Sequence, residues 1–158
     1  MSSFPRNVMM TREAIQSCLS RRLIAKLATQ GRDGFPHIVP VWFLWNNGRI
    51  FVATSRNSLK VRNIQRNDRV AVLLDSAVRS KVWGVLIRGR AQLLYRERAS
   101  KLNRLIHAKY LGKKAMRDPK VVSYFAGDDA TIVVETISVV SWDSRKSSIP
   151  TRGLAIQL

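Results

Sequence analysis

The stretch FVATSRNSLKVRNIQRNDR, residues 51–69, passes from a strand pattern into a helix pattern within a few residues. Its first four residues favour a strand, and Ser58 can cap a short helix over Leu59–Arg66. Val61 and Ile64 fall on one face of that helix, which we expect to be buried. The sequence therefore predicts a polar loop between the end of a strand and the start of a helix.

That polar loop carries groups that bind anions. Backbone N–H groups at a helix N-terminus point outward with a partial positive charge. Thr54, Ser55 and Ser58 offer hydroxyl donors, while Arg56 and Lys60 offer full positive charge. This set is suited to a terminal phosphate. An ordinary capped helix with solvated basic side chains is the alternative that the residues alone leave open.

The preceding residues predict a hairpin. Phe35–Trp45 has the pattern of one long strand, and Asn46-Asn47-Gly48 favours a tight turn that returns along Arg49–Thr54. We expect Val39–Phe43 to run antiparallel to this returning strand. Pro40 lacks an N–H group and so favours an edge position, along which a flat aromatic ligand can lie.

The rest of the chain alternates strands and helices. The expected elements are a helix from Thr11 to Ser20, strands Leu23–Thr29, Arg69–Asp75 and Val82–Tyr95 (bent at Gly84 or Gly89), a helix over Arg96–Leu111 with an inward stripe of Leu102, Leu105, Ile106 and Lys109, a short helix to Phe125, and a strand Thr131–Trp142. Six strands with short links predict a mainly β fold with flanking helices, a small closed antiparallel barrel. We expect a single domain over residues 1–158, with a core of about 11–143 and a C-terminal tail at 144–158.

Charge is the unusual feature of the composition. The chain has 28 Lys and Arg against 10 Asp and Glu, a formal net charge of +18. Such an excess favours anionic partners, such as phosphates, nucleotides, nucleic acid or anionic lipid, although a basic proteome gives the same composition. The basic residues are spread from Arg12 to Arg152, without a helix-turn-helix or an aromatic-basic alternation. We therefore expect only non-specific affinity for polyanions.

Several classes of protein and site are not expected. The apolar runs are too short for a membrane span, and the first residues lack a signal-peptide pattern, so we expect a cytoplasmic protein. Cys18 is a lone cysteine, which excludes an intramolecular disulfide. We find no catalytic triad, carboxylate pair or metal-ligand spacing, and we expect no metal site. His37 belongs to no motif, and we expect His107 to be exposed or at an interface.

The sequence resembles the pyridoxamine 5′-phosphate oxidase-like split-barrel superfamily, whose members bind FMN or the deazaflavin F420. The resemblance spans about Leu23 to Asp143. It rests on the order and spacing of Val39–Phe43, the segment TSRNSLK with Thr54, Ser58 and Lys60, the run Arg66-Asn67-Asp68-Arg69-Val70, Gly89-Arg90-Ala91, Lys109-Tyr110-Leu111-Gly112 and Val140-Ser141-Trp142-Asp143.

This resemblance implies a split β-barrel with an FMN-type cofactor. It implies that Thr54, Ser58 and Lys60 hold the cofactor phosphate and that Val39–Trp42 border the isoalloxazine ring. Together with the loop donors, the expected cofactor-binding set is Val39, Pro40, Val41, Trp42, Thr54, Ser55, Arg56, Ser58 and Lys60. It also implies a homodimer with two cofactor sites at the subunit interface.

Three departures separate the chain from the oxidase that gives the superfamily its name. Leu59 replaces a phosphate-binding arginine, and Gly84 stands about where those oxidases have a glutamine near the ring. Residues 150–154 read PTRGL, in place of the motif that grips pyridoxal phosphate. We expect an FMN-dependent oxidoreductase related to but distinct from that enzyme. The alternatives are an F420-dependent reductase and a non-catalytic flavin-binding protein, and the substrate and electron donor are not identified.

Overall fold

The computed structural model describes residues 9–78 and 81–146. Most of the expected tail, residues 147–158, lies outside the described residues. The elements in these ranges are α1 (Arg12–Ser20), β1 (Ala25–Gln30), β2 (Pro36–Val41), β3 (Leu44–Asn46), β4 (Arg49–Thr54), α2 (Leu59–Arg66), β5 (Arg69–Val78), β6 (Lys81–Tyr95), α3 (Arg96–Ala115), α4 (Pro119–Phe125), β7 (Ala130–Asp143) and a 3-10 turn over Ser144–Lys146.

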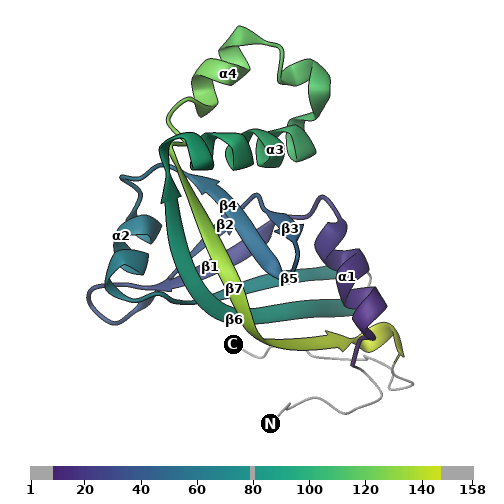
Figure 1. The fold of residues 1–158 in the computed structure, drawn as a ribbon. Helices are drawn as coiled ribbons and strands as arrows, with labels where there is room; N and C mark the ends of the chain where they lie inside the picture. The colour runs from purple at the N-terminus through teal and green to yellow at the C-terminus, as the bar shows by residue number, and fades with distance from the viewer. Residues whose placement is uncertain (1–8, 79–80, 147–158) are drawn as a thin grey trace, which may run out of the picture.

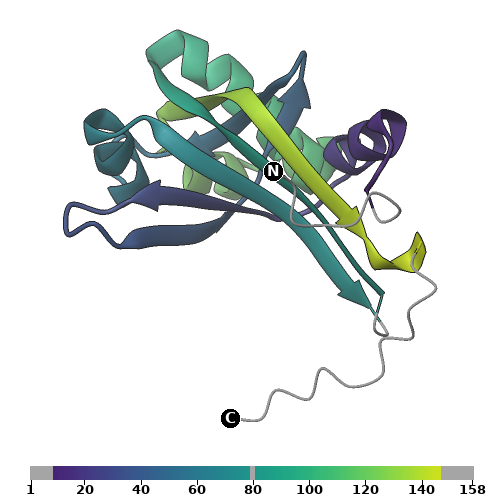
Figure 2. The same cartoon turned by 90° about the horizontal axis from the view of Figure 1, so that it is seen from below.

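The strands form one antiparallel sheet in the order β2-β1-β5-β6-β7-β4-β3. The expected closed barrel is wrong in one respect: β2 and β3 are edges, so the sheet is curved but open, which is compatible with a split barrel. Figure 1 shows α3 lying across one end of the sheet with α4 above it. In Figure 2 the long strands β6 and β7 curve side by side through the molecule.

The expected long strand Phe35–Trp45 is divided in two. β2 ends at Val41 and pairs only with β1, whereas β3 begins at Leu44 and pairs with β4. The predicted pairing of Val39–Phe43 with the returning strand is therefore wrong, and the sheet has seven strands in place of six. The hairpin itself is confirmed, because Asn47 and Gly48 both have positive φ, 47° and 76°.

Helix α3 supplies the reason for the break. The Phe43 N–H donates to the Tyr110 hydroxyl at 3.2 Å, and that hydroxyl donates to the Leu23 carbonyl at 2.5 Å. The Lys109 ammonium donates to the Phe43 carbonyl at 3.2 Å. Two side chains of α3 thus form hydrogen bonds with both the N–H and the carbonyl of Phe43. The chain can therefore cross from β2 to β3, which pairs with β4, without leaving these backbone groups unpaired.

The other local predictions have mixed outcomes. Thr11 caps α1 and Pro40 lies on an edge strand, both as expected. Ser58 has the expected N-cap position of α2, but its side chain makes no capping hydrogen bond. Of the two candidate bends in β6, the register shift falls at Gly89, where a Cβ would lie 2.2 Å from the Glu135 carbonyl oxygen. The inward stripe predicted for α3 is rotated, since Leu105 is 57% exposed and the buried residues are Ala99, Asn103, Ile106 and His107.

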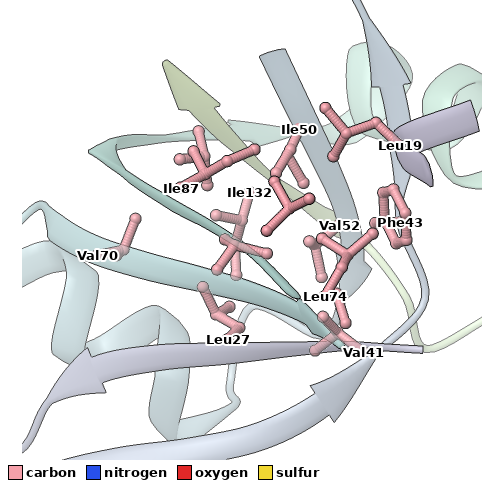
Figure 3. Packing of buried hydrophobic residues seen from close by; sticks show 14 of the residues in the cluster. Leu19, Leu27, Val41, Phe43, Ile50, Val52, Val70, Leu74, Ile87 and Ile132 are labelled. Atoms are coloured by element: carbon pink, nitrogen blue, oxygen red, sulfur yellow. The ribbon is translucent and has the colours of Figure 1, made fainter. Parts of the chain in front are cut away.

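The core fills the concave side of the sheet. Figure 3 shows Leu27, Ile50, Val52, Leu74, Ile87 and Ile132 from five strands converging with Phe43 and with Leu19 of α1. Phe43 is fully buried, so its aromatic ring anchors the crossing between β2 and β3 to the core. Within the described ranges, no helix combines the length and the apolar content needed to cross a membrane.

Removing the Tyr110 hydroxyl tests this explanation of the strand break. We expect Tyr110→Phe to lower the free energy of unfolding by about 1–3 kcal/mol, because the Leu23 carbonyl and the Phe43 N–H both lose their partner. Denaturant titration measures the change. Tyr124→Phe is the matched control, since that ring is 82% exposed. Equal stability of the two variants would show that the hydroxyl does not hold the crossing.

Candidate cofactor site

A cavity of about 410 Å³ lies beside the end of β2 and the start of α2. Its walls come from Ile24, Pro40, Val41, Trp42, Ala53, Lys60, His107, Tyr124, Phe125 and Asp128. The structure thus brings Pro40, Val41 and Trp42, the predicted ring border, into one cavity with Lys60, the predicted phosphate ligand. The volume is in the range of small-molecule sites.

The remaining predicted residues lie outside the lining of this cavity. Thr54, the last residue of β4, is 2% exposed, and its hydroxyl shares a 3.1 Å hydrogen bond with that of Ser58. Thr54 is therefore placed to orient Ser58 at the start of α2. Ser55 accepts a hydrogen bond from the Asn57 N–H at 3.3 Å, and Val39 packs against the core.

Arg56 differs from the other basic residue of the loop. Its backbone N–H donates to the Asp129 carboxylate at 2.8 Å, and its guanidinium pairs with the same carboxylate. Arg56 also borders a separate depression, with Arg62 and Tyr95, on another side of α2. The structure thus gives Arg56 a counter-ion of its own, away from the cavity.

Lys60 is the cation that faces the cavity. Burial lowers its pKa from the ordinary value of 10.5, and the Asp128 charge only partly opposes this effect. In the described part of the chain its ammonium group makes no hydrogen bond or ion pair, so its charge is poorly compensated. A half-buried ammonium without a close partner in an apolar cavity is suited to an anionic group of a ligand.

Aromatic side chains make the opposite wall. The Trp42 ring stacks on Tyr110 with centroids 4.8 Å apart and planes 1° from parallel, and Phe125 of α4 lies 5.6 Å from it. Trp42 sits in the crossing between β2 and β3, so the same α3 contacts that break the strand hold this ring. The result is a flat, apolar surface of the kind that packs against a planar heterocycle.

His107 and Asp128 add a polar pair to the cavity wall. His107 Nε2 lies 2.9 Å from Asp128 Oδ2, and the side chain of His107 is buried. The expectation of an exposed or interface histidine is therefore wrong. Asn103 holds this region in place: it donates to the Asp128 carbonyl at 2.7 Å and accepts from the Thr131 hydroxyl at 2.7 Å. The pair can hold a proton next to a ligand in the cavity.

Sequence reasoning missed six lining residues, namely Ile24, Ala53, His107, Tyr124, Phe125 and Asp128. Four of them come from α3, α4 and the loop before β7, and the apolar periodicity of α3 is weak. One available signal was the pair Tyr124-Phe125 just ahead of Gly127-Asp128-Asp129, which places two aromatic rings beside two acids.

Comparisons with known proteins identify the family and the fold of the chain. Residues 11–136 match the family described as Pyridoxamine 5'-phosphate oxidase. A conserved hypothetical protein from Mycobacterium tuberculosis has a similar structure, with a TM-score of 0.80 and 23% identity over 97% of each chain. A FAD-binding protein from Mesorhizobium loti aligns with a TM-score of 0.63 and 19% identity, over 85% of this chain and 96% of that one. A structure named F420 reductase aligns with a TM-score of 0.60 and 23% identity, over 78% and 94%. At these identities the structures show a shared fold. Among curated proteins, none matches the sequence.

The uncompensated charge of Lys60 leads to a stability prediction. We expect Lys60→Met to raise the free energy of unfolding near neutral pH, because methionine fills a similar volume without burying a charge. As pH rises through the lowered pKa of Lys60, the folded wild-type chain releases this proton and the penalty disappears. The difference in unfolding free energy should therefore narrow toward pH 10.5.

Denaturant titrations of both proteins at several pH values measure this difference. Lys101→Met is the control, since Lys101 lies on the exposed side of α3 and pairs with Glu97. A Lys60→Met protein that is less stable than wild type at neutral pH would contradict the interpretation.

Proposed function

This chain belongs to the pyridoxamine 5′-phosphate oxidase family, and we propose that it is an FMN-binding oxidoreductase, related to but distinct from the enzyme of that name. The observation that carries the proposal is that Trp42, with its aromatic neighbour Phe125, and Lys60 line one open cavity. A planar ring and an anionic tail are the two chemical features that such a space accommodates.

The residues of the cavity fit the two parts of such a cofactor. Lys60 would hold the phosphate from the cavity lining, and the Ser58 hydroxyl, which lies outside that lining and shares a hydrogen bond with Thr54, would assist it. Pro40, Val41 and Trp42 would border the ring on the outer side of β2, which has no strand partner in the residues described. The bound phosphate would also supply the counter-charge that Lys60 lacks.

When bound, the cofactor supplies electron or hydride transfer at its ring. The chain's own residues position and shield it: Trp42 and Phe125 exclude water from one side, and the edge of β2 sets the ring's orientation. Asp128 Oδ2 holds His107 through Nε2 at 2.9 Å, so the other ring nitrogen, Nδ1, would be the atom that donates or accepts a proton from a ligand. No other titratable pair among the described cavity residues has this geometry.

A deazaflavin is the second candidate for the same cavity. The structural similarity to an F420 reductase supports it, and so does the depression beside α2 bordered by Arg56 and Arg62, which is suited to a longer anionic tail. The proposed oxidoreductase function is common to both cofactors. Measured affinities for FMN and for F420 decide between them.

Cofactor binding tests the proposal directly. We expect the natively purified protein to carry a yellow chromophore or to bind added FMN saturably, with F420 titrated in parallel. Lys60→Ala should weaken FMN binding by about 10- to 100-fold, because a charged contact to phosphate contributes about 1.5–3 kcal/mol. Lys101→Ala is the control on the exposed side of α3 and should bind as wild type does.

The outcomes separate the alternatives. Binding of F420 without FMN would assign the deazaflavin and point to reduction of an unsaturated substrate. The bound flavin is also tested anaerobically with reduced nicotinamide nucleotides and other electron donors. If none of them reduces and bleaches it, the protein is a flavin carrier and not an enzyme. Failure to bind either cofactor would overturn the proposed function. An unchanged affinity of Lys60→Ala for FMN would show that Lys60 does not bind the cofactor phosphate.

We also propose that the protein is a homodimer. The outer face of the sheet has a groove of about 660 Å³ lined by parts of β1, β5, β6 and β7. Ile137, at the groove, is 68% exposed, and Phe35 and Ile38 on the β1–β2 hairpin are 73% and 61% exposed. Exposed apolar side chains of this size around a groove favour coverage by another subunit.

Replacing one of these side chains tests the dimer. We expect Ile137→Asp to shift the mass measured by sedimentation equilibrium from dimer toward monomer, because the interface would bury a charge. Ser17→Asp, which introduces the same charge on the exposed side of α1, should leave the mass unchanged. A wild-type protein that sediments as a monomer at high concentration would refute the assembly.

A further inference from the structure

A second groove, of about 790 Å³, lies between α3 and α4. Helix α3 has a kink at Gly112, and in Figure 1 the chain then returns as α4 above the same helix, so that the two helices form an arch. Ala108, Met116, Val121 and Val122 give the groove an apolar lining. No function discussed above uses this space.

Helix α4 is incompletely packed against the groove. It has seven residues and none is buried, while Val122 is 50% exposed and Leu105, across the groove on α3, is 57% exposed. A helix this short is not stable by its own hydrogen bonds and depends on covering an apolar face. An apolar ligand in the groove would cover that face.

Two arginines set the charge at the same groove. Arg96 and Arg104 line it, and neither forms an ion pair in the part of the chain that the structure covers. The two acids of the lining are already engaged, Asp128 with His107 at 2.9 Å and Asp129 with Arg56. The net charge available to a ligand is therefore positive, which favours a carboxylate or sulfonate.

We propose that the groove between α3 and α4 binds a small apolar anion, an aromatic or branched aliphatic carboxylate whose body packs on α4 and whose charge meets Arg96 and Arg104. The groove and the cofactor cavity share His107, Phe125 and Asp128. A ligand in the groove therefore reaches the wall of the cavity. We therefore assign small apolar anions as the substrate class of the oxidoreductase. This assignment rests on the proposed function, whereas the claim that the groove binds such an anion stands without it.

A pair of fluorescent probes tests the site. Anilinonaphthalene sulfonate has an apolar body and one negative charge, and phenylnaphthylamine has the same body without the charge. We expect wild-type protein to bind the sulfonate saturably with one probe per chain. Arg104→Gln, alone and with Arg96→Gln, should weaken sulfonate binding by about tenfold or more and change binding of the neutral probe less than about twofold.

Two further variants control the test. Arg98→Gln removes a charge from the exposed side of α3 outside the groove lining and should leave both affinities unchanged. Val122→Asn should weaken both probes, because it makes the apolar wall polar. An equal loss of sulfonate affinity in Arg98→Gln and Arg104→Gln would show that the overall charge of the protein, and not the groove, attracts the probe, and would overturn the proposal. Absence of saturable sulfonate binding to the wild type would also overturn it.

The test separates this inference from the proposed function. Lys60→Ala should lose affinity for FMN and keep its affinity for the sulfonate. In flavin-loaded protein, the probe should shift the flavin absorption band in wild type but not in Arg104→Gln at the same probe concentration. Sulfonate binding without FMN binding would support the ligand site in the groove and refute the proposed cofactor site. FMN binding without sulfonate binding would support the cofactor site and refute the ligand site in the groove.

Discussion

The hydroxyl of Tyr110 joins two parts of the chain on which the rest of the structure depends. It donates to the Leu23 carbonyl ahead of β1 and accepts from the Phe43 N–H beyond β2, while Lys109 binds the Phe43 carbonyl. These contacts end the pairing with β1 and allow the chain to pair next with β4, so that β2 and β3 become opposite edges of one curved sheet. They also fix Trp42, because its ring stacks on Tyr110. The fold and one wall of the cavity thus have a common cause.

A second set of polar contacts builds the facing wall. The Thr131 hydroxyl donates to Asn103, and Asn103 donates to the Asp128 carbonyl, which brings the Asp128 carboxylate to His107. Except for Asp128, these side chains are almost wholly buried, where an unpaired polar group is costly. The loop before β7 is therefore held to α3 at a defined position. Because α4 is attached to the same loop, the Phe125 ring is brought against Trp42, with centroids 5.6 Å apart, in the cavity lining.

The sequence predicted what local rules determine and missed what long-range contacts determine. The helix start at Ser58 and the turn at Asn47-Gly48 depend on near neighbours, and both positions were confirmed, although the Ser58 hydroxyl bonds to Thr54 and does not cap the helix. The break at Trp42–Phe43 was missed because its cause lies more than sixty residues away, in Tyr110. His107 was misplaced for a related reason: the buried face of α3 is selected by the loop at Asp128, and the apolar periodicity of the helix gives no sign of it.

The large positive charge of the chain has different consequences at different sites. Arg56 has a carboxylate partner and is largely exposed, so its charge is partly compensated and screened by solvent. Among the residues that the structure describes, Lys60 is half-buried without such a partner, and Arg96 and Arg104 border an apolar groove without an ion pair. The half-buried charge of Lys60 costs folding free energy that a bound anion would return, whereas Arg96 and Arg104 are exposed and offer their charge to a ligand without that cost. In a chain with a net charge of +18, the unpaired cations beside cavities, rather than the total charge, therefore indicate where ligands bind.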